Sequence, residues 1–209
     1  MYDFSIAMAL VDFIPVVFFA VSAVLMMRDF YFQMPKYGFA MLAAGTINVF
    51  SAGLLKATWK LLYAAGICDF HALNTLFLPT QSLGFLMAGI AMVILVCGSK
   101  RAALAVAAPP VFTGTALFLV MMVLGLGCIC TCLSILAVRL KKKGAALLFA
   151  LSFVASMGMG YAGRLDSTAS WVNWLEQSIN IVSQGCLMWG VLILHNAGQR
   201  RIDGWQTNL

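Results

Sequence analysis

Charged side chains are scarce in this sequence, and their scarcity decides the class of protein. Aspartate, glutamate, lysine and arginine make up 10% of the 209 residues, whereas 63% are hydrophobic and the mean hydropathy is +0.97. A soluble domain of this size could not bury so much apolar surface. The composition therefore predicts an all-α integral membrane protein, with a single multipass transmembrane domain over residues 1–209 in the lipid bilayer of the cell membrane.

Signatures of catalysis and of cofactor binding are also absent. The sequence has no nucleotide-binding loop, no HExxH motif, no Ser/His/Asp arrangement and no acidic metal cluster. Its two histidines, His71 and His195, fall near opposite membrane surfaces, so they cannot ligate one metal or haem. The bases behind the net charge of +6 stand at helix ends, as topology signals do. We therefore predict no cofactor, metal or nucleic-acid partner, and no enzyme is indicated.

Long apolar runs are what the sequence has instead. Each run is near the roughly 20 residues that a bilayer core requires. They predict seven transmembrane helices, at about 5–27, 38–60, 76–98, 102–118, 119–139, 144–163 and 171–195. The fourth span is short and contains Pro109 and Pro110, and a six-helix alternative would cover 101–139 with one span.

The basic residues favour seven spans, with the N-terminus outside and the C-terminus in the cytoplasm. Cytoplasmic loops carry an excess of lysine and arginine. In this arrangement ten of the thirteen bases are cytoplasmic: Arg28, Lys36, Lys100, Arg101, Arg139, Lys141, Lys142, Lys143, Arg200 and Arg201. Only Lys56, Lys60 and Arg164 lie toward the outside.

An internal echo suggests a 3+1+3 parallel repeat. Gly84, Leu86, Met87 and Gly89 match Gly185, Leu187, Met188 and Gly190 at a constant offset, and each block runs on to a basic pair. Coincidence in a Gly/Leu/Met-rich sequence is the alternative. Parallel three-helix repeats resemble the architecture of sugar transporters of the SWEET type, although their proline–asparagine signature is missing here.

Polar side chains from separate spans gather in one leaflet, toward the outside. A charged group inside a membrane is costly, so it faces protein or water and usually has a partner. We predict an outward-open binding cavity whose candidate residues are Asp12, Asn48, Lys56, Lys60, Gln81, Tyr161, Glu176, Gln177 and Asn180. The structural alternatives are that Lys60 extends to the lipid headgroups, that Asp12 bonds a neighbouring helix, and that Glu176 pairs with Lys56.

Two functions fit this pattern. The first is a small transporter or channel, in which Lys56 meets an anionic or zwitterionic small-molecule solute and Glu176 is a titratable gate. The second is a receptor or assembly subunit that binds a ligand or partner helix without translocation, either as a homo-oligomer or with a membrane partner subunit. We also expect Trp59, Trp171 and Trp174 in an outer aromatic belt, with Trp189 packed more deeply.

Overall fold

The protein is a bundle of helices in a computed structural model that describes residues 5–98, 115–162 and 170–198. No strand occurs in these ranges. In chain order the helices are α1 (Ile6–Val11), α2 (Phe13–Phe30), α3 (Lys36–Ala64), α4 (Ala72–Cys97), α6 (Thr115–Arg139), α7 (Lys143–Ala162) and α8 (Ser170–Asn196). Five helical stretches are long and apolar enough to cross a membrane, and α7 is a shorter apolar helix. This indicates a membrane protein.

The first helical stretch is interrupted at Asp12, and the sequence explains why. Ser5 caps α1 by accepting a hydrogen bond from the backbone N–H of Met8 at 3.2 Å. Pro15 lies three residues after Asp12, has no backbone N–H, and would crowd the carbonyl of Val11, four residues before it. The helix therefore ends at Val11 and restarts at Phe13. The break places the Asp12 carboxylate at the junction of α1 and α2.

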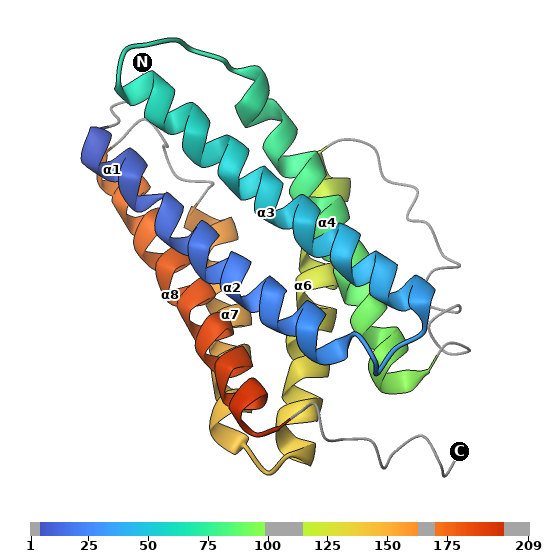
Figure 1. The fold of residues 1–209 in the computed structure, drawn as a ribbon. Coiled ribbons are helices and arrows are strands. Elements are labelled where there is room, and N and C mark those ends of the chain that lie inside the picture. The colour runs from blue at the N-terminus through green and yellow to red at the C-terminus, as the bar shows by residue number, and fades with distance from the viewer. Residues whose placement is uncertain (1–4, 99–114, 163–169, 199–209) are drawn as a thin grey trace.

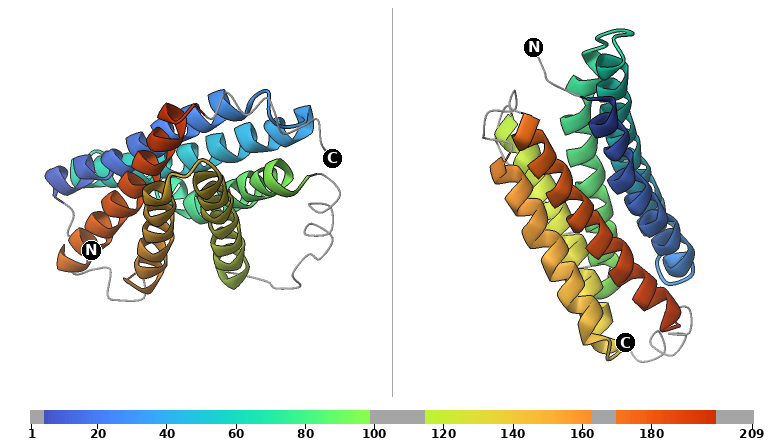
Figure 2. Two further views of the ribbon diagram at one scale, coloured as in Figure 1. Left: turned by 90° about the horizontal axis from the view of Figure 1, so that it is seen from below. Right: turned by 90° about the vertical axis from the view of Figure 1, so that its left-hand side faces the viewer.

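The helices form a ring in which each packs on its neighbours in the order α2, α3, α4, α6, α7, α8 and back to α2. Figure 2 shows α2–α4 and α6–α8 as two adjoining groups, joined by the α4–α6 and α2–α8 contacts. Neighbours run antiparallel except at these two joints (Figure 1). We call the two ends of the bundle the Asp12 end, where α1, α4, α6 and α8 begin, and the Asp29 end, where α2, α4, α6 and α8 finish.

Glycine allows the close contacts at α4. A Cβ on Gly45 of α3 would lie 2.6 Å from the backbone nitrogen of Ala88, and one on Gly89 would lie 2.6 Å from the carbonyl oxygen of Gly125 on α6. Real Cβ atoms do not approach backbone so closely, so these helices are in near backbone contact through small residues, as is common in membrane bundles. Both α3 and α6 are thereby fixed against α4.

The bundle exposes many large apolar side chains and also buries a set of polar ones within its mainly apolar interior. Large apolar side chains are exposed along the outward faces of the helices, including Val17, Val24, Leu147, Val154, Val182 and Trp189. Buried polar side chains include Ser22, Asp29, Thr46, Lys60, Ser82, Ser152, Asn173, Gln177 and Ser183. Lipid would solvate the first group, whereas the second can be satisfied only inside the bundle.

Two sequence expectations about the helices need revision. The fifth span does not begin at 119, because α6 begins at Thr115 and takes in the last residues of the proposed fourth span. Residues 102–114 of that fourth span lie outside the described residues, so seven membrane spans are not observed. The remaining six predicted segments are helical, as α1 with α2, α3, α4, α6, α7 and α8, with boundaries that differ by a few residues, and five of them are long and apolar enough to cross a membrane.

Candidate functional site

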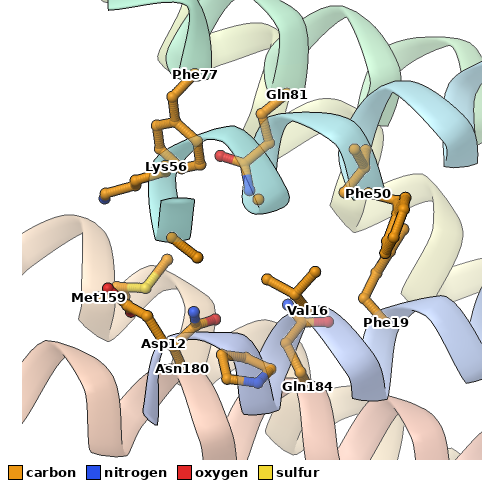
Figure 3. A pocket seen from close by; sticks show the side chains of 14 residues that line it. Asp12, Val16, Phe19, Phe50, Lys56, Phe77, Gln81, Met159, Asn180 and Gln184 are labelled. Atoms are coloured by element: carbon orange, nitrogen blue, oxygen red, sulfur yellow. The ribbon is translucent and has the colours of Figure 1, made fainter. Parts of the chain in front are cut away.

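A cavity of about 80 Å³ lies inside the ring, toward the Asp12 end. Its walls come from α2, α3, α4, α7 and α8 and from the α1–α2 junction. The lining residues are Asp12, Pro15, Val16, Phe19, Val49, Phe50, Gly53, Lys56, Ala57, Phe77, Gln81, Met159, Asn180 and Gln184. Figure 3 shows the amides of Gln81, Asn180 and Gln184 around the same space as Asp12 and Lys56. Residues far apart in the sequence thus meet in one chamber whose walls are mainly apolar and carry five polar side chains.

The Asp12 carboxylate is held by an ion pair across the α1–α2 junction and α3. Lys60 Nζ lies 2.8 Å from Asp12 Oδ2, and the exposed fractions of the two side chains are 6% and 14%. A pair this buried depends on both members, because removing one leaves an uncompensated charge in a low-dielectric interior. The negative charge of Asp12 in the cavity wall is therefore already largely matched.

Lys56 is the cation that remains in the cavity wall. Its ammonium lies 4.3 Å from the centre of the Phe77 ring, an arrangement in which the ring face stabilises positive charge. It forms no ion pair within 4 Å with any residue that the structure describes. The charges of Asp12, Glu176 and Lys60 act on it electrostatically from farther away. The wall of the chamber thus offers one ammonium group that has no carboxylate in direct contact.

A stripe of amides on α8 leads into the cavity. Asn173, Gln177, Asn180 and Gln184 follow one another at steps of four, three and four residues, so they share one face of the helix. The same stripe continues with Leu187, Val191 and Leu194, all buried. It is therefore polar from the Asp12 end to the level of the cavity and aliphatic beyond it. We call the first part the amide stripe and the second the aliphatic stripe.

Two amides of this stripe have hydrogen-bonding capacity left over. Gln177 is 2% exposed, yet its Oε1 and Nε2 have no hydrogen-bond partner among the described residues. Gln184 Oε1 is buried and unpartnered in the same sense. A buried unpaired polar group costs about 1–3 kcal/mol, and such groups in native proteins are usually met by water or by a bound molecule. Gln177 and Gln184 therefore offer hydrogen-bonding groups to a bound solute or water molecule.

The candidate residues from the sequence are only partly brought together. Asp12, Lys56, Gln81 and Asn180 line the cavity. Lys60 does not line it but pairs with Asp12, so the expectation that its ammonium extends to the headgroups is wrong. Glu176, Gln177 and Asn48 are outside the lining: Glu176 and Asn48 are half-buried, and Gln177 is buried. The side chain of Tyr161 lies outside the described residues.

Two of the four tryptophan side chains with a predicted position, Trp59 and Trp189, differ from that prediction. Trp171 and Trp174 are exposed at the Asp12 end, in agreement with an aromatic belt. Trp59 is only 2% exposed, and its Nε1–H donates a hydrogen bond to Asp69 Oδ1 at 2.9 Å, in the turn before α4. Trp189 is 62% exposed on the outside of α8 and neither packs in the core nor lines the cavity.

The structure adds a contact that the sequence did not suggest. His195 Nδ1 lies 2.9 Å from both carboxylate oxygens of Asp29, joining the last turns of α2 and α8 at the Asp29 end. Both residues stand next to basic helix termini, where a polar side chain ordinarily faces water, so spacing alone gave no signal for the pairing.

Comparison with protein-family models, with curated proteins and with solved structures finds no match to the chain, so its function is inferred from this geometry.

Proposed function

We propose that the protein is a small multipass membrane transporter whose chamber binds a small anionic or zwitterionic solute entering from the Asp12 end. The observation that supports this most directly is the Lys56 ammonium in the cavity wall. It has no carboxylate within ion-pair distance among the described residues, and neutral amides stand around it. A carboxylate or other small anion would pair with Lys56 and accept hydrogen bonds from Gln81 and Asn180.

The size of the cavity restricts the solute. A water molecule needs about 10–15 Å³ of such space, so about 80 Å³ holds several waters or a solute of a few non-hydrogen atoms. Sites for drug-sized molecules are commonly about 300–1,000 Å³. Chloride, formate or a zwitterion the size of glycine therefore fits the observed conformation, and a hexose does not. A zwitterion would direct its ammonium toward Glu176.

The interior supports a carrier over an open channel. Toward the Asp29 end the aliphatic stripe faces a buried apolar core that contains Phe30, Met26 and Met92. An ion cannot cross such a segment without hydration or polar ligands. A solute in the chamber could leave toward the Asp29 end only after the helices move apart, which is the alternating access of a carrier.

The distribution of bases supports assigning the Asp29 end to the cytoplasm. Of the bases that the structure describes, Arg28, Lys36, Arg139 and Lys141–Lys143 stand at that end, and Lys56 and Lys60 stand toward the other. The proposal therefore keeps an external N-terminus and a cytoplasmic C-terminus at the cell membrane.

The proposal also keeps seven spans and a parallel repeat. In α2–α4 and in α6–α8 alike, the third helix packs on the middle helix of its own group and on the first helix of the other, as two related units would. Because α4 and α6 run in the same direction, a further crossing between them would account for the seventh span.

Flux measured in proteoliposomes tests the proposal. Purified protein would be assayed for exchange of radioactive chloride, formate and glycine, with protein-free liposomes to subtract passive leakage. We expect exchange of at least one probe. This exchange should be lost in Lys56→Met, because the substitution removes the ammonium group with which the bound anion pairs. Glu176→Gln should alter glycine exchange more than chloride exchange. Lys36→Met, an exposed lysine on the same helix, is the matched control and should behave as the wild type.

The second candidate, a receptor or assembly subunit, is favoured by one observation. The polar lining stops at the level of Gln184, so the described conformation has a binding chamber but no path across the bundle. In that case Lys56→Met would abolish binding of the probe, no probe would be exchanged by the wild type, and a membrane partner would co-purify in fixed proportion.

A further inference from the structure

The Asp29–His195 contact lies at the end of the bundle opposite the cavity and plays no part in lining it. The side chain of Asp29 is 3% exposed and that of His195 is 23% exposed. One ring nitrogen faces both carboxylate oxygens at 2.9 Å, a geometry that is strongest when the imidazole is protonated and charged. Histidine is the side chain whose charge ordinarily changes between about pH 5 and pH 8.

The two helices joined by this contact both line the cavity, and they meet at one of the two joints between the helix groups. Both α2 and α8 line the chamber, through Val16 and Phe19 on one and Asn180 and Gln184 on the other. They run parallel and touch again at Phe18 and Gly185. The aliphatic stripe of α8 lies between the chamber and the Asp29–His195 contact. An exit path that opens between α2 and α8 on this side would break the contact.

The charges around the pair fit a proton-dependent link. Asp29 is the only acidic residue that the structure describes at this end. The other charged groups that the structure describes at the Asp29 end are exposed bases: Arg28 on α2, Lys36 at the start of α3, Arg139 at the end of α6 and Lys141–Lys143 at the turn into α7. Because His195 is the more exposed partner, its proton exchanges with water at the Asp29 end.

We propose that Asp29 and His195 form a proton-binding latch that closes the cytoplasmic end of the transport pathway. With a proton on His195, the ion pair holds α8 against α2. As pH rises and that proton is lost, the charge attraction disappears and α8 can leave α2. Acid on the Asp29 side therefore slows transport, and alkali there speeds it. The effect on flux rests on the proposed transport function, whereas the latch itself does not.

The first test measures chloride and formate exchange at an internal pH of about 5.5 and of about 8. We expect the wild-type rate to fall about fivefold or more on acidification, the lower range of typical coupling between sites. His195→Gln and Asp29→Asn should lose this dependence and keep the faster rate at both values. The chain has one other histidine, so His71→Gln, in the turn before α4, is the matched control and should keep it. A His195→Gln protein with the wild-type dependence would overturn the latch.

The second test needs no solute. Hydrogen–deuterium exchange of the last two turns of α8 would be compared between wild type and His195→Gln in nanodiscs at each pH, so that intrinsic exchange rates cancel. We expect slower exchange in the wild type at the lower pH and no difference at the higher one, with α3 and α4 unchanged as evidence of folding. Equal exchange at both values overturns the latch. If this difference is found but no probe is transported, the transport function fails and the latch stands.

Discussion

Removing Lys60 should destabilise the bundle strongly, because it leaves the Asp12 carboxylate without its cation. At 2.8 Å and an effective dielectric constant of about 20, the gross attraction between the two charges is about 6 kcal/mol. Desolvation of both groups offsets much of this, and breaking one side of a buried pair typically costs about 3–5 kcal/mol. We expect a loss in that range for Lys60→Met.

A double-variant cycle separates the pair from the general effect of the substitution. Free energies of unfolding would be measured in mixed detergent micelles for Lys60→Met, Asp12→Asn and the combination. If the pair carries the effect, Asp12→Asn should recover part of the stability lost in Lys60→Met, with a coupling energy of about 2 kcal/mol or more. Lys36→Met should lie within about 0.5 kcal/mol of the wild type. Additive losses, with coupling below about 0.5 kcal/mol, would refute the structural role assigned to the pair.

Four further substitutions test the packing around the site. Gly45→Ala should lower stability by about 1–3 kcal/mol, because the new Cβ would clash with the backbone of α4. Gly158→Ala is its control: no atom lies within 4 Å of the new Cβ, so stability should rise by about 0.5–1 kcal/mol. Thermal unfolding with the opposite order would contradict the helix contact. Ser183→Ala removes the hydroxyl that bonds α7 at 2.6 Å and should lower stability by about 0.5–2 kcal/mol in the same assay. Trp59→Phe loses the bond to Asp69 and should speed hydrogen exchange in the turn at 65–71, and unchanged exchange would argue against that anchor.

Hydropathy and charge were enough to predict much of the fold and the depth of the site. Apolar length limits where a chain can cross a bilayer, and it gave six of the predicted helical segments to within a few residues, five of which are long and apolar enough to cross a membrane. Depth along those spans placed Asp12, Lys56, Gln81 and Asn180 at a common level, and all four line the cavity. These four polar residues are easy to recognise in the sequence because the residues around them are mostly apolar. The place of Gln184 in the chamber came from the structure.

What the sequence did not predict depends on the rotation and packing of the helices. Lys56 and Lys60 lie one turn apart on α3, and the structure shows that Lys60 is the one that pairs with Asp12 at the α1–α2 junction. His195 lies near a basic helix end, and its partner is 166 residues away, so only the parallel packing of α2 and α8 brings them together. The predicted fourth span was the least well defined, because proline in a short apolar run weakens the length criterion, and most of it lies outside the described residues.

The most direct test of the account is the position of a bound anion. Crystals grown from lipid and soaked in bromide, a chloride analogue with a strong anomalous signal, would locate every ordered halide site. The account predicts a bromide peak within hydrogen-bond reach of Lys56 Nζ, beside Gln81 and Asn180, that disappears in Lys56→Met. Bromide confined to the bases of the Asp29 end, with none in the chamber at saturating concentration, would contradict it.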